Sequence, residues 1–251
     1  MPKSRLQEAW SEGRYYLLPS FLQFLSYLAS PKVTKEVDVK LVFRTFGDDI
    51  VEVARELDFF VDGQHPVGLP ALPERFRLKL EPSARRVGTF YRDGFKEDGT
   101  ALAVGTLTKV PFSSKLVEEG ASAPNNFYAA LDPEVKVIRG FQSIQATLDA
   151  MLQESSTLAL RDYWEWWSAH AEDGQYGKLL LVDEEKDGIA VFFDDHIEAH
   201  HSHIVDVRDV RSGAPVDFEK SRGKYLQRVE PFAAITDPDY FTSLFEMYVT
   251  K

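Results

Sequence analysis

The stretch Ile189-Ala190-Val191-Phe192-Phe193-Asp194-Asp195-His196 runs from five apolar residues straight into two adjacent carboxylates. The apolar run is short and β-prone, which predicts a strand buried on both faces, the pattern of a parallel sheet. Ligand sites in open parallel sheets lie just beyond the carboxyl ends of strands. Two adjacent acids repel each other unless a cation or a shared proton offsets the repulsion. The stretch therefore predicts a divalent metal site at the edge of a parallel sheet.

The composition limits the classes of protein and partner. The chain has 251 residues, 44% hydrophobic and 27% charged, which is typical of one large globular domain or a core with an insertion. A formal net charge of -11 disfavours nucleic acid and anionic membranes as partners. With no cysteine, the chain has no disulfide framework and no thiol nucleophile. We find no signal region or membrane-spanning run and expect a soluble, cytoplasmic protein.

Helical and strand-like patterns alternate along most of the chain. Apolar spacing predicts a helix at residues 19–29, then a strand at 39–43 and a helix at 49–60. This alternation predicts an α/β fold with a Rossmann-like, mostly parallel sheet flanked by helices. Further helices are expected at 141–152, 158–171 and 239–248, and further strands at 135–139, 178–182, 189–193 and 204–207.

Residues 62–134 differ from the rest of the chain in composition and in sequence pattern. Gly and Pro are frequent there, and short β-prone pieces alternate with turn signals. We therefore predict a small β-rich insertion at 62–134 between two parts of the α/β core, residues 1–61 and 135–251. The expected strands of the insertion lie at 75–80, 86–91 and 101–110.

Polar side chains accompany three of the predicted strands. Thr45 follows the strand at 39–43, where its hydroxyl and the N–H groups after it can bind an anion. Lys178 begins the strand at 178–182 and supplies one positive charge. Asp194 and Asp195 offer oxygen ligands, which a hard cation prefers. Together these residues predict a site for a phosphate and Mg2+.

The order of these residues resembles motifs II, III and IV of the haloacid dehalogenase-like superfamily. Its members are mostly magnesium-dependent phosphatases and phosphotransferases on a Rossmann-like sheet. The sequence Val-Phe-Arg-Thr-Phe-Gly around Thr45 matches motif II, Lys178 matches motif III, and Asp194-Asp195 matches motif IV. The match covers residues 17–60 and 172–210.

The resemblance implies a role for each matched residue. Asp194 or Asp195 would bind magnesium, and Thr45, Phe46, Gly47 and Lys178 would hold the phosphate of a small phosphorylated molecule. Of these, Lys178 and Thr45 would take part in catalysis, with Lys178 stabilising the charge that develops on the phosphoryl group.

The sequence departs from the family at motif I, an Asp-x-Asp that ends the first strand and supplies the nucleophile and the general acid/base. Residues 1–16 contain no aspartate. The family's first strand is also central, between the strands of motifs II and IV, so its loss would leave backbone groups in need of partners. We expect either a truncated chain or a degenerate member, with little or no phosphatase activity.

Two other ways to fill the central position remain open. One is strand exchange in a dimer. The other is residues 231–236, read as a strand that ends in Asp237-Pro238-Asp239. The simpler interpretation of that acidic pair is a cap on the last helix, with Pro238 at its first position.

Four histidines lie close together in the sequence, at His196, His200, His201 and His203. No single helical or extended conformation brings all four to one point. They are either part of a polar loop and strand start or ligands of a transition metal such as zinc or nickel. The functional hypotheses are therefore a phosphohydrolase-related protein with a partial magnesium site, a non-catalytic binding or assembly protein on the same fold, and a histidine-bound transition-metal protein.

Overall fold

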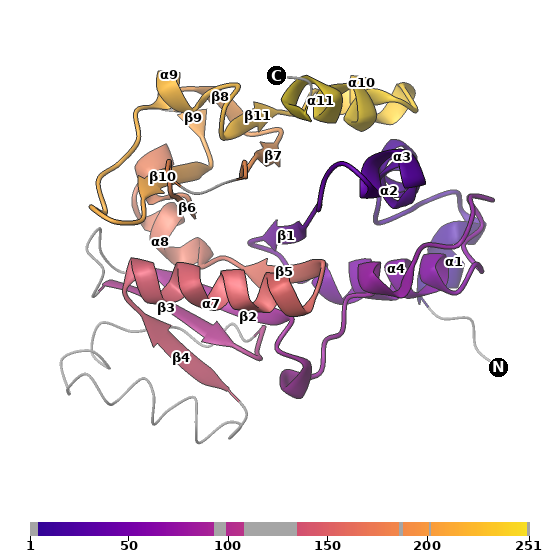
Figure 1. Ribbon diagram of the computed structural model, residues 1–251, viewed down its shortest axis with the longest axis horizontal. Coiled ribbons are helices and arrows are strands. Elements are labelled where there is room, and N and C mark those ends of the chain that lie inside the picture. The colour runs from indigo at the N-terminus through magenta and orange to yellow at the C-terminus, as the bar shows by residue number, and fades with distance from the viewer. Residues whose placement is uncertain (1–4, 93–98, 108–134, 186–187, 201, 250–251) are drawn as a thin grey trace.

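The computed structural model describes residues 5–92, 99–107, 135–185, 188–200 and 202–249, and its largest unit is a five-stranded sheet. The strand order is β1-β5-β2-β3-β4; the first three are parallel, while β3 and β4 are each antiparallel to the strand before them (Figure 1). The bounds are β1 Leu41–Thr45, β2 Val87–Arg92, β3 Thr100–Val104, β4 Lys136–Arg139 and β5 Thr157–Arg161.

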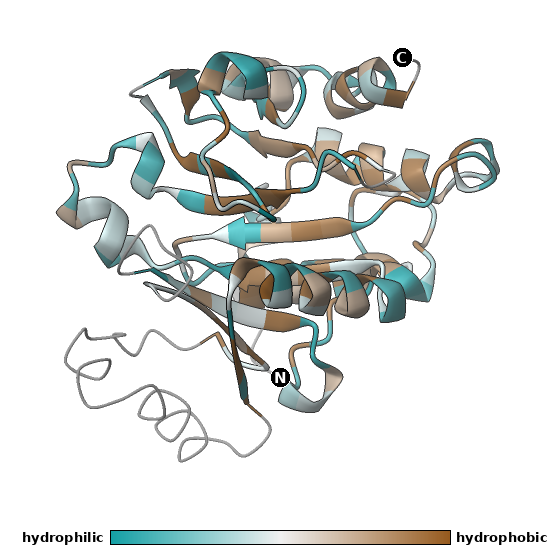
Figure 2. Cartoon of the chain, turned by 60° about the vertical axis from the view of Figure 1, so that its left-hand side comes forward, coloured by the Kyte–Doolittle hydropathy of each residue, from teal (hydrophilic) through white to brown (hydrophobic). Residues whose placement is uncertain are grey.

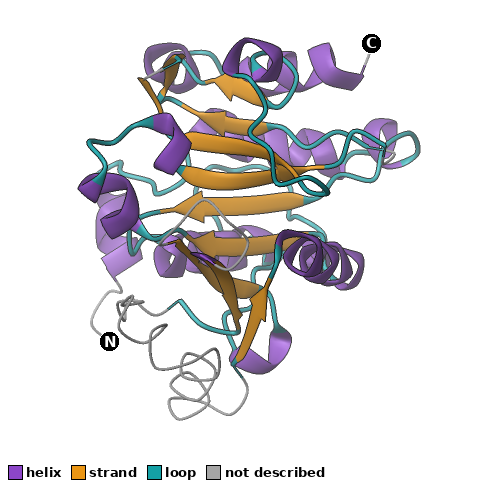
Figure 3. Cartoon of the chain, turned by 90° about the vertical axis from the view of Figure 1, so that its left-hand side faces the viewer, coloured by secondary structure: helices purple, strands orange, loops and turns teal. Residues whose placement is uncertain are grey.

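Three strand pairs accompany this sheet. Two of them, β6 with β10 and β7 with β11, are parallel, and β8 with β9 is antiparallel. Figure 3 shows the strands in one stack, with helices on both sides. The bounds are β6 Lys178–Val182, β7 Phe192–Asp194, β8 Ile197–Ala199, β9 Ser202–His203, β10 Val205–Asp209 and β11 Leu226–Arg228.

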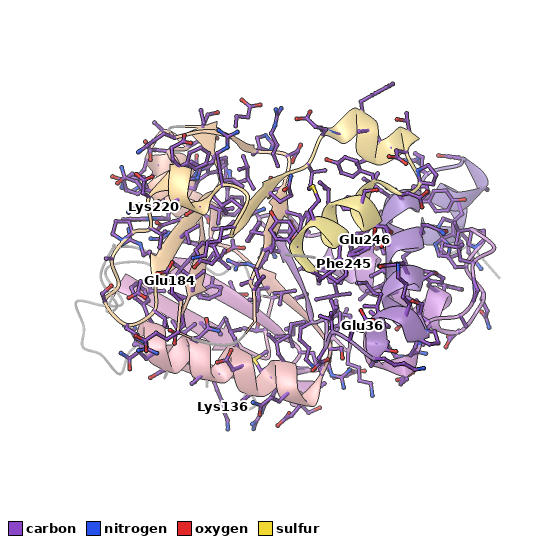
Figure 4. The ribbon with its side chains drawn as sticks, turned by 45° about the horizontal axis from the view of Figure 1, so that its top comes forward. Glu36, Lys136, Glu184, Lys220, Phe245 and Glu246 are labelled. Atoms are coloured by element: carbon purple, nitrogen blue, oxygen red, sulfur yellow. The ribbon has the colours of Figure 1, made fainter. Side chains whose placement is uncertain are left out.

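The helices form where apolar residues recur at helical spacing. In α2, Pro19 occupies the first turn, where its missing N–H costs nothing, and Leu22, Leu25 and Leu28 are buried. Figure 4 shows Phe245 and Glu246 on α11, and Glu246 accepts a hydrogen bond from the Tyr27 hydroxyl of α2. The bounds are α1 Arg5–Ser11, α2 Pro19–Ala29, α3 Pro31–Thr34, α4 Ile50–Val61, α7 Phe141–Glu154, α8 Trp164–Ala169, α9 Phe218–Ser221, α10 Pro231–Thr236 and α11 Tyr240–Val249.

Apolar clusters cover both faces of β5. Ala159 packs in the cluster that includes α2 and α4, whereas Leu158 and Leu160 pack in the cluster under α7. All five residues of β5 are buried, as expected for an interior strand of a parallel sheet. Figure 2 shows hydrophobic residues along the strands of the interior. The prediction of an α/β protein with a mostly parallel sheet flanked by helices is confirmed.

Three predicted elements are wrong. The strand expected at 75–80 does not form, and only a 3-10 turn at Glu74–Phe76 occurs there. The helix expected at 158–171 is strand β5 followed by the short helix α8, because pairing with β1 and β2 on both edges outweighs the helix propensity of Leu and Ala. The strand considered at 231–236 is helix α10, in which Pro231 takes the first-turn position that suits it.

Other predicted elements differ in extent. The strand expected at 189–193 is the shorter β7, residues 192–194, and the strand expected at 39–43 is β1, residues 41–45, so that Thr45 lies within it. The strand at 101–110 appears as β3, and residues 108–110 lie outside the described residues.

The described strands of the predicted insertion, β2 and β3, lie in the same sheet as β1 and β5. No helix among the described residues is both long enough and apolar enough to cross a membrane.

Candidate functional site

The side chain of Lys178 meets that of Asp194 at the start of β6. Its Nζ lies 3.0 Å from Asp194 Oδ2, and the lysine side chain is 7% exposed. The same ammonium lies 5.3 Å from the ring centroid of Phe46 and 5.7 Å from that of Phe192. One carboxylate and two aromatic rings therefore stabilise a buried positive charge. Residues from β6, β7 and the segment after β1 converge here.

Asp195 and His196 extend this group towards solvent. The side chain of Asp194 is 11% exposed and that of Asp195 is 52% exposed. Asp194 Oδ1 accepts the backbone N–H of His196, and His196 Nδ1 lies 3.2 Å from Asp195 Oδ1. One ligand atom from each of the three residues falls within 4.8 Å of the others. The two carboxylates suit a hard cation such as Mg2+, with Asp195 the more accessible.

The Thr45 hydroxyl binds both Gly47 and Asp49. The Thr45 hydroxyl donates to Asp49 Oδ1 at 2.9 Å and accepts the Gly47 N–H at 2.8 Å. A Cβ on Gly47 would lie 2.6 Å from Asp49 Oδ1, so a side chain here would displace the Asp49 carboxylate from this position. These two predicted phosphate-binding groups therefore bond within their own turn. It is Phe46, between them, whose ring reaches Lys178.

A buried ion pair that the sequence analysis missed lies beside Lys178. Arg44 donates from Nε to Asp162 Oδ2 at 2.8 Å, and its Nη2 binds the other carboxylate oxygen. Its Nη1 donates to the backbone oxygen of Leu179 at 3.0 Å. Asp162 follows β5, the segment that was read as a helix, so its place at a strand end was not foreseen. The pair links β1 and β5 to the start of β6.

A second buried cluster holds the other side of β6. Arg92 donates to Asp206 Oδ2 at 2.7 Å and to the backbone oxygen of Gly177 at 2.9 Å. Arg208 Nε donates to the same oxygen of Asp206 at 2.7 Å. Burial lowers the pKa of Arg92, and the neighbouring Asp206 carboxylate opposes that shift. The backbone immediately before Lys178 is therefore fixed from β2 and β10.

An open pocket of about 430 Å³ lies next to Asp194 and Asp195. Its other walls are mainly apolar and come from β1, α2, β7, α10 and α11, with Phe43 and Phe193 among them. We call it the Phe43–Phe193 pocket. A smaller pocket of about 140 Å³ lies by Phe46, Arg161 and Trp164.

The histidines do not form a cluster of their own among the described residues. His203 stacks on Phe218 with ring centroids 4.6 Å apart, and burial lowers the pKa of His203. The ring of His200 lies 6.4 Å from that of Phe218. In the described part of the chain, His196 alone joins a group able to hold a metal ion, and its partners there are the two aspartates. His201 lies outside the described residues.

The Asp-x-Asp at Asp237 and Asp239 does not follow a strand. Asp237 comes directly after helix α10, and its Oδ1 accepts the N–H of Asp239 at 2.9 Å. The pair thus forms the turn that precedes α11. The hypothesis that these residues replace the missing motif I strand is wrong.

No family model, curated protein or solved structure matches the chain.

Proposed function

We propose that this chain is a phosphohydrolase-related protein with a Rossmann-like fold of the haloacid dehalogenase type, which binds Mg2+ and a small phosphorylated molecule without hydrolysing it. The observation that carries the proposal is the contact between Lys178 and Asp194. The two residues were assigned to motifs III and IV from the sequence alone, and their side chains meet at 3.0 Å. The motif II segment reaches the same point through Phe46.

The donor set fits a hard cation. Asp195 and Asp194 would hold it, and water would complete its preferred set of oxygen ligands. When bound, the cation would neutralise charge on a phosphate. Lys178 contributes a fixed positive charge on the inner side of the same carboxylates, because its stem and ammonium are enclosed by Phe46 and Phe192.

The proposal of binding without hydrolysis concerns these 251 residues and is supported by the carboxylates that they contain. Asp194 and Asp195 are the proposed cation ligands, and a phosphatase of this type needs a further aspartate as nucleophile. Residues 1–16 contain none. We propose the cytoplasm as the location of the protein, in keeping with a chain that has no cysteine for disulfides.

Thermal melting with and without cation tests the binding part of this proposal. A ligand that binds only the folded state stabilises it by RT ln(1 + [L]/Kd), which is about 2.7 kcal/mol at roughly a hundred times Kd. We expect Mg2+ to raise the melting temperature of the wild type and to leave that of Asp195→Asn unchanged. If millimolar Mg2+ does not change the melting temperature of the wild type, the result would favour the alternative of a non-catalytic binding or assembly protein.

Two further measurements separate the alternatives. Release of phosphate from p-nitrophenyl phosphate should not exceed the uncatalysed rate. If hydrolysis occurs and is lost in Asp194→Ala, another group has replaced the nucleophile and the inactivity claim fails. Zinc or nickel retained through purification, and lost on combining His200→Ala with His201→Ala, would instead support the transition-metal protein.

A further inference from the structure

Strand β1 has an edge that no described strand occupies. The N–H of Leu41 donates to Ser156 O, and the oxygen of Thr45 accepts from Asp162 N–H, so these two residues direct their backbone groups towards β5. Backbone groups alternate in direction along a strand. The N–H and C=O of Val42 and Arg44 therefore point away from β5, where no described strand pairs with β1.

Strand β7 has the same property. The N–H of Phe192 donates to Tyr225 O, and the oxygen of Asp194 accepts from Val229 N–H, both towards β11. The backbone groups of Phe193 must then point to the opposite edge, which no described strand occupies. Two open strand edges thus belong to one small region of the molecule.

Both strands contribute to the walls of the Phe43–Phe193 pocket. Phe21 of α2 and Phe241 of α11 line it as well, and their rings are 5.5 Å apart. Its volume of about 430 Å³ is large enough for several side chains. An apolar pocket beside open backbone donors and acceptors has the features of a strand-binding site.

The rim of the pocket is apolar on its solvent side. Ile235 is 61% exposed and Tyr16 is 44% exposed, and both line the pocket. Exposed apolar residues gathered around a pocket mark interaction sites more often than singly scattered ones do.

Charge distinguishes one end of the pocket from the rest. Asp194 contacts Lys178, whereas Asp195 is half exposed and, among the described residues, has the exposed ring of His196 at 3.2 Å but no lysine or arginine at ion-pair distance. A segment that enters the pocket would therefore be apolar along its length and basic at the end beside Asp195.

We propose that the Phe43–Phe193 pocket binds an extended segment of another polypeptide, which pairs with the open edge of β1, places alternate apolar side chains in the pocket and a lysine or arginine beside Asp195. The main-chain hydrogen bonds to Val42 and Arg44 supply affinity, and the apolar wall with Asp195 supplies selectivity. The inference does not need the cation proposed above, but the basic residue and the cation would compete for Asp195, which is why the test removes the cation with EDTA.

The test uses the full chain in EDTA and a fluorescein-labelled peptide of alternating valine and threonine with one terminal lysine. Fluorescence anisotropy should show saturable binding. Binding should weaken at least tenfold, about 1.4 kcal/mol, when glutamate replaces the lysine or proline replaces alternate threonines of the peptide. Undiminished binding of the proline peptide would mean that no backbone pairing occurs.

One substitution in the protein tests the backbone pairing at the open edge of β1. Val42→Pro removes the outward N–H alone and leaves the β1–β5 ladder intact, because proline is accepted on edge strands when its nitrogen faces outwards. Val42→Thr is the matched control that retains the N–H. Equal melting temperatures of the two variants would show that both are folded; only Val42→Pro should lose peptide affinity, and equal affinity would overturn the proposal.

Amide hydrogen exchange gives a second, independent measurement on the wild type. Saturating peptide should slow exchange at Val42 and Arg44 and leave Phe43 unchanged, because the Phe43 N–H faces β5 in the ladder. Absence of any saturable binding would overturn the inference. A second pair of results would also overturn it: sedimentation that shows a dimer, together with slow exchange of the β1 amides in the absence of peptide. The occupant of the β1 edge would then be a second copy of this chain.

Discussion

Strands β5 and β7 begin from similar apolar sequences and end in different structures. Strand β5 pairs with β1 and β2, spans five residues and is buried throughout. Among the described strands, β7 pairs with β11 alone and spans three residues. Ile189, the first residue of its apolar run, is 62% exposed. A neighbour on both edges turns an apolar run into a regular interior strand. The candidate site lies where the described pairing is incomplete, and one of its two carboxylates, Asp195, is half exposed.

The largest expected effect is on the free energy of unfolding, when a large apolar side chain is removed from β5 or from β7. Leu160→Ala in β5 should cost about 3 kcal/mol of unfolding free energy, because the residue is 1% exposed and its cavity cannot collapse between two layers. Phe193→Ala in β7 should cost about 1 kcal/mol, since that ring already lines an open pocket. Urea denaturation measures both; equal losses would contradict the difference in packing.

The next largest expected loss of stability comes from a substitution at Gly177, the residue that precedes Lys178. In Gly177→Ala, the new Cβ would lie 2.1 Å from the backbone oxygen of Ile204, so β6 and β10 must separate. We expect a loss of about 2 kcal/mol, in the range of overpacked cores. A far-UV circular dichroism melt would detect it. If the midpoint does not fall, β10 does not approach β6 as closely as described.

Separate substitutions of Asp194 and Asp195 compare a buried carboxylate at the end of β7 with the exposed carboxylate that follows it. Asp194→Asn leaves the buried Lys178 ammonium without its carboxylate, and we expect a loss of about 2 kcal/mol at neutral pH. Asp195→Asn, at a side chain that is 52% exposed, should change stability by less than about 0.5 kcal/mol. Chemical denaturation of the two variants in EDTA provides the comparison. Equal changes would show that Lys178 does not depend on Asp194.

The smallest expected effect is a pH dependence that arises away from both strands. His203 stacks on Phe218 and lies near Asp173, Asp206 and His200, and burial lowers its pKa below the usual 6.5. The neutral ring is favoured in the folded state, so its contribution to stability is present above pH 6.5 and is lost as the pH falls through the lowered pKa.

The wild type should therefore lose more stability than His203→Phe when the pH is lowered from about 7.5 to about 5.5. Urea denaturation at the two pH values measures the difference. Parallel losses in the two proteins would assign the pH dependence to other groups.

The resemblance to motifs III and IV put Lys178 and Asp194 in one site, and their side chains do meet. The rule that carboxyl ends of parallel strands share an edge does not explain this contact, because Lys178 begins β6 whereas Asp194 ends β7. It misread β5, since Leu158, Ala159 and Leu160 favour a helix until strands pair on both sides. The Arg44–Asp162 pair joins residues 118 positions apart, and only the sheet order places them together. The open edge of β1 also depends on which strands are neighbours, which local sequence does not encode.

Isothermal titration of the metal-free chain with MgCl2 tests the central claim most directly, because Asp195→Asn removes a proposed ligand with little expected loss of stability. We expect one saturable binding event in the wild type, made tighter by inorganic phosphate, and none in Asp195→Asn. Identical titrations of the two proteins, or no binding by either, would contradict a cation and phosphate site at the end of β7.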